Sequence, residues 1–224
     1  MSVTLEYGYS SLNKKGEELC GDNVQTYTDG KHTTVVLADG MGSGVKANIL
    51  SMLTSKILCT MVASEISIED CVETILETLP VCKVRNVAYA TFTVVHIDDE
   101  GKGVMFEFDN PPAIYFSNGK CRDIERKEMC VLGKKVYKSD LDMQEGDIIV
   151  FMSDGVIHAG IGMLLNFGWQ RPEVMEYLDR VIEPRMTAKA VACQLAGACN
   201  DLYMNEPGDD TTVAAVKLRK SMQV

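Results

Sequence analysis

Cationic residues and histidine are scarce in this chain of 224 residues. Lysine and arginine together number 22 against 32 acidic residues, and with only three histidines the formal net charge is −10. Such a surface repels the phosphate backbone of nucleic acids, which argues against a nucleic-acid partner. A phosphorylated substrate stays compatible with this charge if a bound metal ion reverses the local field.

Closely spaced cysteine pairs, a secretory leader and a bilayer-length apolar run are also missing. The eight cysteines contain no C-x-x-C pair, and the histidines lie away from them, so a zinc site of cysteines is excluded. We therefore expect reduced thiols in a cytoplasmic protein with no membrane association. The six prolines are scattered and no linker composition is found, which predicts a single domain over residues 1–224.

The sequence does contain a regular succession of strand and helix patterns. Alternating or continuous apolar runs predict strands at 3–11, 23–28, 32–39, 88–98, 103–109, 113–117, 120–125, 147–153 and 211–218, with one or two short strands in 129–142. Helical periodicity predicts helices at 44–63, 68–79, 172–182 and 187–203, the second and fourth beginning after the N-cap residues Ser67 and Thr187. The apolar positions 47, 50, 53, 57, 58 and 61 of the first helix are expected to face the core. Antiparallel hairpins and paired helices favour an α+β fold over a doubly wound parallel sheet.

Acidic residues stand where several strand patterns begin or end. Asp39 closes an apolar run and opens a turn with three glycines, and Asp154 closes another such run. Asp209 and Asp210 directly precede the last strand, and Asp22 opens an earlier one. We expect these acids to meet in space.

Carboxylates gathered in this way would raise one another's pKa values unless divalent cations lie between them. Hard oxygen ligands with no histidine or thiolate beside them select Mg²⁺ or Mn²⁺ rather than Zn²⁺. Asp39 could bridge two ions about 3.5–4 Å apart, and Gly40 could offer its carbonyl oxygen. A water between two ions would lose its proton near neutral pH and could attack phosphorus in line.

Three of these stretches resemble, in this order, the signature motifs of the metal-dependent (type 2C, PPM) serine/threonine phosphatases. They are Ala-Asp-Gly-Met-Gly-Ser-Gly at 38–44, Met-Ser-Asp-Gly at 152–155 and Gly-Asp-Asp-Thr-Thr-Val at 208–213. The form of the first motif, with Cys-Gly-Asp-Asn at 20–23 and Phe-Asp-Asn-Pro-Pro-Ala at 108–113, is similar to the bacterial branch typified by the stage II sporulation E phosphatase. The resemblance spans about residues 4–218.

The resemblance implies an α-β-β-α sandwich, two antiparallel β-sheets flanked by pairs of helices, with two Mn²⁺ or Mg²⁺ ions at one end. Asp39 would bridge both ions, and Asp154 and Asp209 would bind the first. The carbonyl of Gly40 would bind the second ion, which Asp22 would hold directly or through water. Of these residues, Asp39, Asp154 and Asp209 also carry the catalytic role that the resemblance implies.

Two functional residues of many family members have no clear counterpart in this chain. Many members carry a general-acid histidine where Met41 stands, and the arginine with which they grip phosphate has no clear equivalent. His158 is either structural or a substitute acid, and Asp210 is expected behind the ligands. Candidate phosphate contacts, alternatively solvated surface charges, are Lys14, Lys15 and Lys46. Residues 157–169 resemble in position the variable helical element that the family carries beside the metal site. Alternatively, they form a buried apolar connection anchored by Trp169.

Three functions remain open on these grounds. The first is hydrolysis of phosphoserine or phosphothreonine on a protein, by analogy an anti-sigma-factor antagonist. The second is a non-catalytic phosphoprotein-binding regulatory module, and the third is hydrolysis of a small phosphorylated metabolite. Control of the activity would come from a regulatory partner, a homodimer contact or the expression level.

Overall fold

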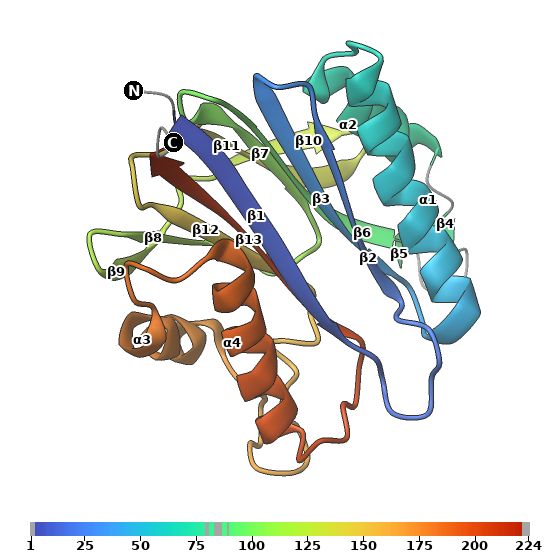
Figure 1. Cartoon of the computed structure of the whole chain (residues 1–224). Helices are drawn as coiled ribbons and strands as arrows, with labels where there is room; N and C mark the ends of the chain where they lie inside the picture. Colours follow the sequence, from blue (N-terminus) through green and yellow to red (C-terminus); the bar gives the residue numbers. More distant parts are fainter. Residues whose placement is uncertain (1–2, 79–80, 83–86, 89, 221–224) are drawn as a thin grey trace.

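Two antiparallel sheets face each other in the computed structural model, which describes residues 3–78, 81–82, 87–88 and 90–220 (Figure 1). The five-stranded sheet has the order β1 (Val3–Leu12), β13 (Thr211–Lys220), β12 (Ile148–Met152), β8 (Ile114–Ser117), β9 (Lys120–Asp123). The six-stranded sheet has the order β10 (Lys127–Val131), β11 (Lys134–Asp142), β7 (Lys102–Phe108), β6 (Ala90–Asp98), β3 (His32–Gly40), β2 (Asp22–Thr28). A small hairpin pairs β4 (Val81–Cys82) with β5 (Val87–Ala88).

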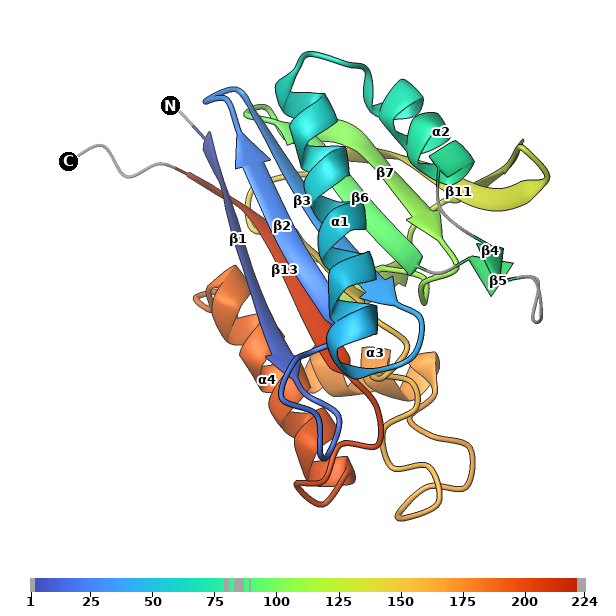
Figure 2. The same cartoon turned by 90° about the vertical axis from the view of Figure 1, so that its right-hand side faces the viewer.

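Each sheet carries a pair of helices on its outer face (Figures 1 and 2). The helices α1 (Gly44–Ala63) and α2 (Ile68–Thr78) cover the six-stranded sheet, where α1 lies on β2, β3 and β6. The helices α3 (Arg171–Val181) and α4 (Ala188–Leu202) cover the five-stranded sheet, where α4 lies on β1 and β13. The predicted α-β-β-α sandwich is thus confirmed.

Strand β12 shows why the core is organised in layers. All five of its residues are buried, because its sheet meets the other sheet on one face and helices on the other. Ile149 and Phe151 join the apolar cluster between the two sheets. Ile148, Val150 and Met152 join the cluster beneath α3 and α4. The continuous apolar run in the sequence is therefore a strand buried on both faces.

Most predicted elements are found within two residues of their expected ends. The stretch 129–142 forms two strands, β10 and β11, and the predicted strand 88–98 is represented by β5 and β6 on either side of residue 89, which lies outside the described residues. Both predicted N-caps are confirmed: Ser67 Oγ accepts from the Asp70 N–H at 3.2 Å, and Thr187 Oγ1 accepts from the Ala190 N–H at 3.0 Å. The hairpin β4–β5 was not predicted.

The predicted core face of α1 is correct at Ala47 and Leu58, which are fully buried, and wrong at Leu53 and Ile57, which are exposed. The side that packs on the sheet consists mainly of small residues, including Ala47, Ser51, Thr54 and Ser55. The helix lies so close to β3 that a Cβ atom on Gly40 would come within 2.0 Å of the Ala47 carbonyl oxygen. Larger side chains on the inner face would push the helix away from the sheet.

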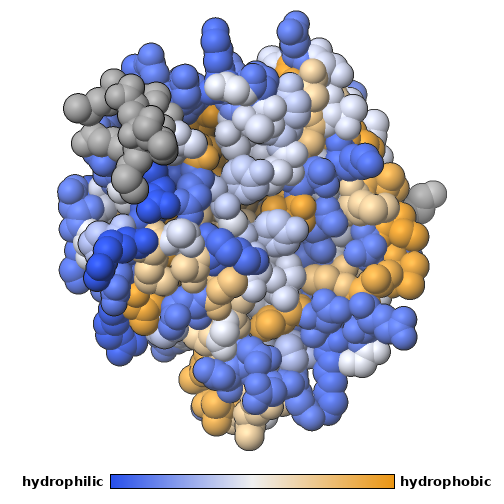
Figure 3. Space-filling model, viewed as in Figure 1, coloured by the Kyte–Doolittle hydropathy of each residue, from blue (hydrophilic) through white to orange (hydrophobic). Residues whose placement is uncertain are grey.

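The outer face of α1 is apolar instead. Leu53 and Ile57, both expected in the core, are 49% and 41% exposed. The exposed large apolar residues of this helix are Val45, Ile49, Met52, Leu53 and Ile57. They account for apolar surface at the right-hand edge of Figure 3, where α1 lies in Figure 1. By length and composition α1 also passes for a membrane-spanning helix, but in this structure it covers the outer face of the six-stranded sheet.

Residues 157–169 are only in part the buried connection that the sequence allows. Trp169 is 8% exposed, belongs to the core beneath α3 and α4, and contacts Tyr177 edge-on at 5.2 Å between ring centroids. Ile161, Leu164 and Phe167 are exposed, Phe167 to 83%. The segment is therefore anchored at its end by Trp169, while its middle presents apolar side chains outward.

Candidate metal centre

The first pair of acids is brought together by strand register. Asp22 and Asp39 lie directly opposite each other in the antiparallel pair β2–β3, so their side chains emerge on the same face of the sheet. The N–H of Gly40 donates to the carbonyl of Gly21 at 3.1 Å and closes this end of the pair. Two like charges directly opposite each other destabilise a strand pair, so this position needs a compensating group.

The second sheet joins the first at this point. Ser153, which follows β12, donates from Oγ to Asp22 Oδ2 at 2.7 Å and accepts from the Thr212 N–H at 2.9 Å. This buried link ties the end of β12 and the start of β13 to the end of β2–β3. Asp154 and Asp209 are adjacent to these anchors and therefore reach the same end of the sandwich.

A cavity of about 290 Å³ lies between the acids. It is lined by Asp39, Gly40, Met41, Gly42, Ala90, Thr91, Asp109, Asp154 and Asp209. None of these lining residues is a lysine or an arginine. Asp39, Asp154 and Asp209 thus line one cavity with no cationic side chain in its lining, and Asp22 lies opposite Asp39 on the neighbouring strand.

The electrostatics of this cluster favour a cation. Burial raises the pKa of Asp39 far above its usual range, and the charges of Asp22, Asp154 and Asp209 raise it further. Burial also raises the pKa of Asp22, although its hydrogen bonds from Ser153 and Thr212 act in the opposite direction. These carboxyl groups are costly to ionise unless positive charge is placed between them.

Two buried oxygen atoms of the cluster have no hydrogen-bond partner among the described residues. They are Asp22 Oδ1 and Asp210 Oδ2, whose residues are each 4% exposed. The other oxygen of Asp210 accepts from the Lys14 N–H at 2.9 Å, which leaves this acid behind the cavity rather than in its wall. Oxygen atoms of this kind, gathered without donors, are the ligand set that Mg²⁺ and Mn²⁺ prefer. The residues present therefore fit a divalent metal centre.

Two glycines of the acidic motifs lie where close packing leaves no room for a side chain. A Cβ on Gly155 would come within 2.1 Å of the Asp210 carbonyl oxygen, comparable with the 2.0 Å approach of a Cβ on Gly40 to Ala47. Either side chain would force apart the backbone segments that carry the acids. That the Gly40 carbonyl is a metal ligand stays a prediction.

His158 stands beside the acids. Its Nδ1 lies 3.7 Å from Asp154 Oδ2 and 4.0 Å from Asp209 Oδ2. The expectation that the acids have no histidine beside them is therefore wrong. The sequence signal was the spacing of four residues from Asp154, which places both side chains on one side of a helical turn.

The candidate phosphate-binding lysines are only partly near the site. Lys15 pairs with Glu206 at 2.7 Å, and both side chains are largely exposed. Lys14 lies close enough to Asp209 for its charge to lower the pKa of that acid, although burial raises this pKa overall.

Asp109 is a cavity residue that the sequence prediction missed. It follows β7 with a left-handed backbone (φ +56°), and burial raises its pKa. The next residue, Asn110, accepts from Thr91 Oγ1 at 2.6 Å and donates to Thr93 Oγ1 at 3.1 Å. These bonds tie the loop after β7 to β6. The signal was an acid at a strand end, the same feature that identified Asp39.

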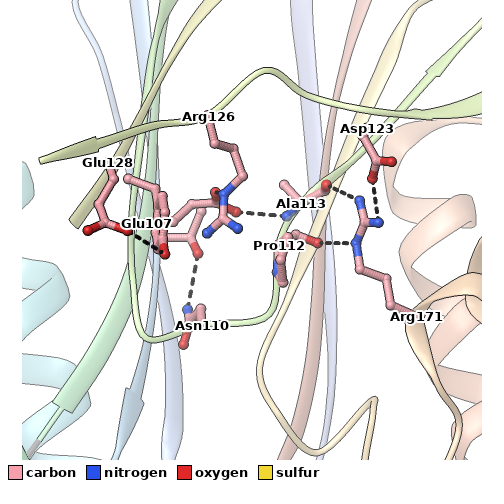
Figure 4. Close-up of polar contacts among 10 residues, drawn as sticks. Glu107, Asn110, Pro112, Ala113, Asp123, Arg126, Glu128 and Arg171 are labelled. Atoms are coloured by element: carbon pink, nitrogen blue, oxygen red, sulfur yellow. Dashed lines mark hydrogen bonds and ion pairs between the residues drawn. The ribbon is translucent and has the colours of Figure 1, made fainter. Parts of the chain in front are cut away.

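The rest of this loop is held in place by polar contacts with Glu107 and Arg171 (Figure 4). The N–H of Ala113 donates to Glu107 Oε1 at 2.7 Å, and Arg126 pairs with the other oxygen of this fully buried carboxylate at 2.7 Å. Arg171 at the start of α3 donates to the carbonyls of Pro112 and Ala113 at 3.0 and 2.8 Å. The Asn-Pro-Pro segment therefore acts as a rigid support that presents Asp109 to the cavity.

Comparison with known proteins identifies the family. The profile of the family described as stage II sporulation protein E (SpoIIE) matches residues 29–219. Comparison with curated protein sequences finds no match.

Solved structures share the fold. The PP2C phosphatase domain of SpoIIE from Bacillus subtilis, solved with a fragment of its regulatory domain, is 19% identical with a TM-score of 0.82, covering 99% of this chain and 65% of that one. The RsbU and RsbW domains of a Mycobacterium tuberculosis protein are 17% identical with a TM-score of 0.77, covering 99% and 63%. This chain thus spans slightly less than two thirds of either of these. RsbX in complex with magnesium is 19% identical with a TM-score of 0.68, covering 97% and 100%. The chain belongs to the SpoIIE family and has the PP2C phosphatase fold.

Proposed function

We propose that this chain is a metal-dependent serine/threonine protein phosphatase. The observation that carries the proposal is the cluster of Asp39, Asp154 and Asp209 from both sheets, which lines one cavity without lysine or arginine, with Asp22 directly opposite Asp39 on the neighbouring strand. Such a cluster serves little purpose in folding, because like charges repel, but it is well suited to hold two divalent ions. Family membership supports the same function.

The proposed ligands follow from position in the cluster. Asp39, between Asp22 and the acids of the other sheet, would bridge two ions. Asp154 and Asp209 would hold one ion, and Asp22 with the carbonyl of Gly40 would hold the other. When bound, such ions supply charge stabilisation at phosphorus and activation of water.

The surrounding residues keep this arrangement in place. Ser153 holds Asp22 through its 2.7 Å hydrogen bond and thereby links the two sheets at this end of the sandwich. The support behind Asp109 fixes the opposite wall of the cavity. Met41 in the lining cannot move a proton, so the wall on that side only excludes water.

A protein substrate suits the cavity better than a metabolite. Its volume of about 290 Å³ lies just below the roughly 300–1,000 Å³ usual for pockets that enclose small molecules. The cavity would admit a phosphorylated serine or threonine side chain, with the rest of the substrate outside. A phosphorylated anti-sigma-factor antagonist is the substrate we propose by analogy. The seven cysteines with described side chains are free thiols, which agrees with a cytoplasmic location for this reaction.

The test is phosphate release from an aryl phosphate and from phosphoserine peptides, with and without Mn²⁺. We expect turnover only with the metal, and at least a hundredfold loss in Asp39→Asn and Asp154→Asn. Asp99→Asn, in an exposed turn, is the matched control and should keep full activity. Metal binding without turnover on any substrate would favour the phosphoprotein-binding module. Turnover that is unchanged in the two cluster variants would refute the proposed site.

A further inference from the structure

We propose that His158 is a metal ligand, which together with Asp154 and Asp209 forms a mixed nitrogen and oxygen site. Such a site binds first-row transition ions such as Mn²⁺ in preference to Mg²⁺. The inference rests on the proposed phosphatase function and refines its cation site. It departs from the all-oxygen ligand set that the acidic motifs alone would provide.

The distances from His158 to the two acids fit one shared ion. The ligand atoms of Asp154, His158 and Asp209 all lie within 4.8 Å of one another. The Nδ1 atom is 3.7 and 4.0 Å from the two carboxylate oxygens, beyond the range of a hydrogen bond. Two ligands that each lie about 2.0–2.2 Å from a metal can be no more than about 4.4 Å apart. Both histidine separations meet this limit.

The turn that carries His158 is firmly anchored. Its N–H donates to the carbonyl of Asp154 at 3.0 Å, and the neighbouring Val156 and Ala159 are fully buried in the core. The buried hydroxyl of Tyr203 donates to the carbonyl of Gly155 at 2.7 Å. The imidazole therefore projects from a fixed backbone toward the acids, which is the preorganisation that a metal ligand requires.

The other two histidines are excluded by position. His32 and His96 stack on each other with ring centroids 5.2 Å apart. His32 begins β3 and Asp39 lies seven residues further along the strand, which at about 3.3 Å per residue separates them by ~23 Å. Any histidine nitrogen found on a metal in this chain is thus assigned to His158.

The choice of metal follows from the donor. Carboxylate and water suit both Mg²⁺ and Mn²⁺, whereas an added imidazole favours the first-row transition ions over Mg²⁺, with affinity rising from Mn²⁺ to Cu²⁺. Replacing His158 by a carboxylate should therefore bring the preference back toward Mg²⁺ without removing the site.

The test is pulsed electron paramagnetic resonance of bound Mn²⁺, which detects the hyperfine coupling of a ligating imidazole nitrogen. The wild type and the control His32→Ala should show this coupling. His158→Ala and His158→Asp should lose it while still binding Mn²⁺. By calorimetry, the ratio of Mn²⁺ to Mg²⁺ affinity should fall by about 10–100-fold in His158→Ala.

The outcomes separate this inference from the proposed function. Bound Mn²⁺ without nitrogen coupling in the wild type would overturn the role of His158 and leave the phosphatase proposal intact. Coupling that persists in His158→Ala would also overturn it. If the wild type binds no Mn²⁺ at all, the inference and the proposed metal centre fail together.

Discussion

Replacing Asp39 by asparagine should change the stability of the protein in opposite directions with and without a divalent cation. Asp39 faces Asp22 directly across the β2–β3 pair, and the exchange removes one charge while keeping the shape of the side chain. Two carboxylates about 5 Å apart repel by about 3 kcal/mol at an effective dielectric constant near 20. Partial protonation relieves some of this repulsion, so we expect the metal-free variant to be about 2 kcal/mol more stable at pH 8.

The cation reverses this order. For a chain of this length, about 2 kcal/mol corresponds to a Tm increase of roughly 4–8 °C, measured by differential scanning calorimetry in a chelator. At Mn²⁺ concentrations about 1,000-fold above Kd, each bound ion stabilises the wild type by about 4 kcal/mol, whereas the variant lacks the bridging carboxylate. The wild type should then melt above the variant. A variant that is less stable than the wild type in the chelator would refute the argument that the acids repel in the absence of metal.

Three further predictions concern charge, packing and backbone. Burial raises the pKa of Asp22 and Asp39, so the folded metal-free protein holds protons that the unfolded chain releases above about pH 4, and its stability falls as the pH rises. The Tm of the metal-free wild type should therefore drop further below that of Asp39→Asn between pH 5 and pH 8. A Tm difference that narrows over this range would contradict the argument. In α1, Leu58→Ala at a fully buried position should lower the free energy of unfolding, measured by urea denaturation, by about 2–5 kcal/mol. Ile57→Ala on the exposed face should lower it by less than about 1 kcal/mol. Equal losses in the two variants would refute the observed orientation of the helix. Asp109→Ala should lower the free energy of unfolding by about 1 kcal/mol, because alanine disfavours the left-handed backbone at φ +56°. Asp109→Asn should leave the free energy of unfolding unchanged in the same assay. A destabilised asparagine variant would show that the charge, not the backbone, determines the residue at this position.

The strands and helices were predictable because their patterns are local. Strand β12 is a continuous apolar run, and the N-caps Ser67 and Thr187 stand directly before apolar periodicity. Such signals require only neighbouring residues, so element ends were correct to within about two residues. The hairpin β4–β5 has strands of only two residues each, too short to produce a period.

The orientation of α1 was only partly predictable from its apolar residues: Ala47 and Leu58 face the core as expected, but Leu53 and Ile57 do not. Hydrophobic periodicity assumes that large apolar side chains face the core. Here the close approach of the helix to Gly40 selects Ala47, Ser51 and Ser55 for the inner face, and Leu53 and Ile57 are directed outward. Only the distance between the helix and the sheet reveals this, and that distance depends on the whole sandwich.

The sequence likewise revealed only some of the residues of the site. Asp39, Asp154 and Asp209 stand at strand ends next to glycine, so their motifs were visible in the sequence. Asp109 stands in the motif at 108–113 and His158 lies four residues after Asp154, but their place at the cavity depends on the loop supported by Glu107 and on a turn after β12. Topology, rather than residue type, brings them to the acids.

The most direct test of the metal centre is a calorimetric titration of the metal-free protein with Mn²⁺, beside the Asp39→Asn variant. The proposed cluster predicts two bound ions in the wild type and the loss of at least one of them in the variant, because Asp39 would bridge both. Identical binding curves for the two proteins, or no binding by the wild type, would contradict the assignment of these carboxylates to a metal-dependent phosphatase.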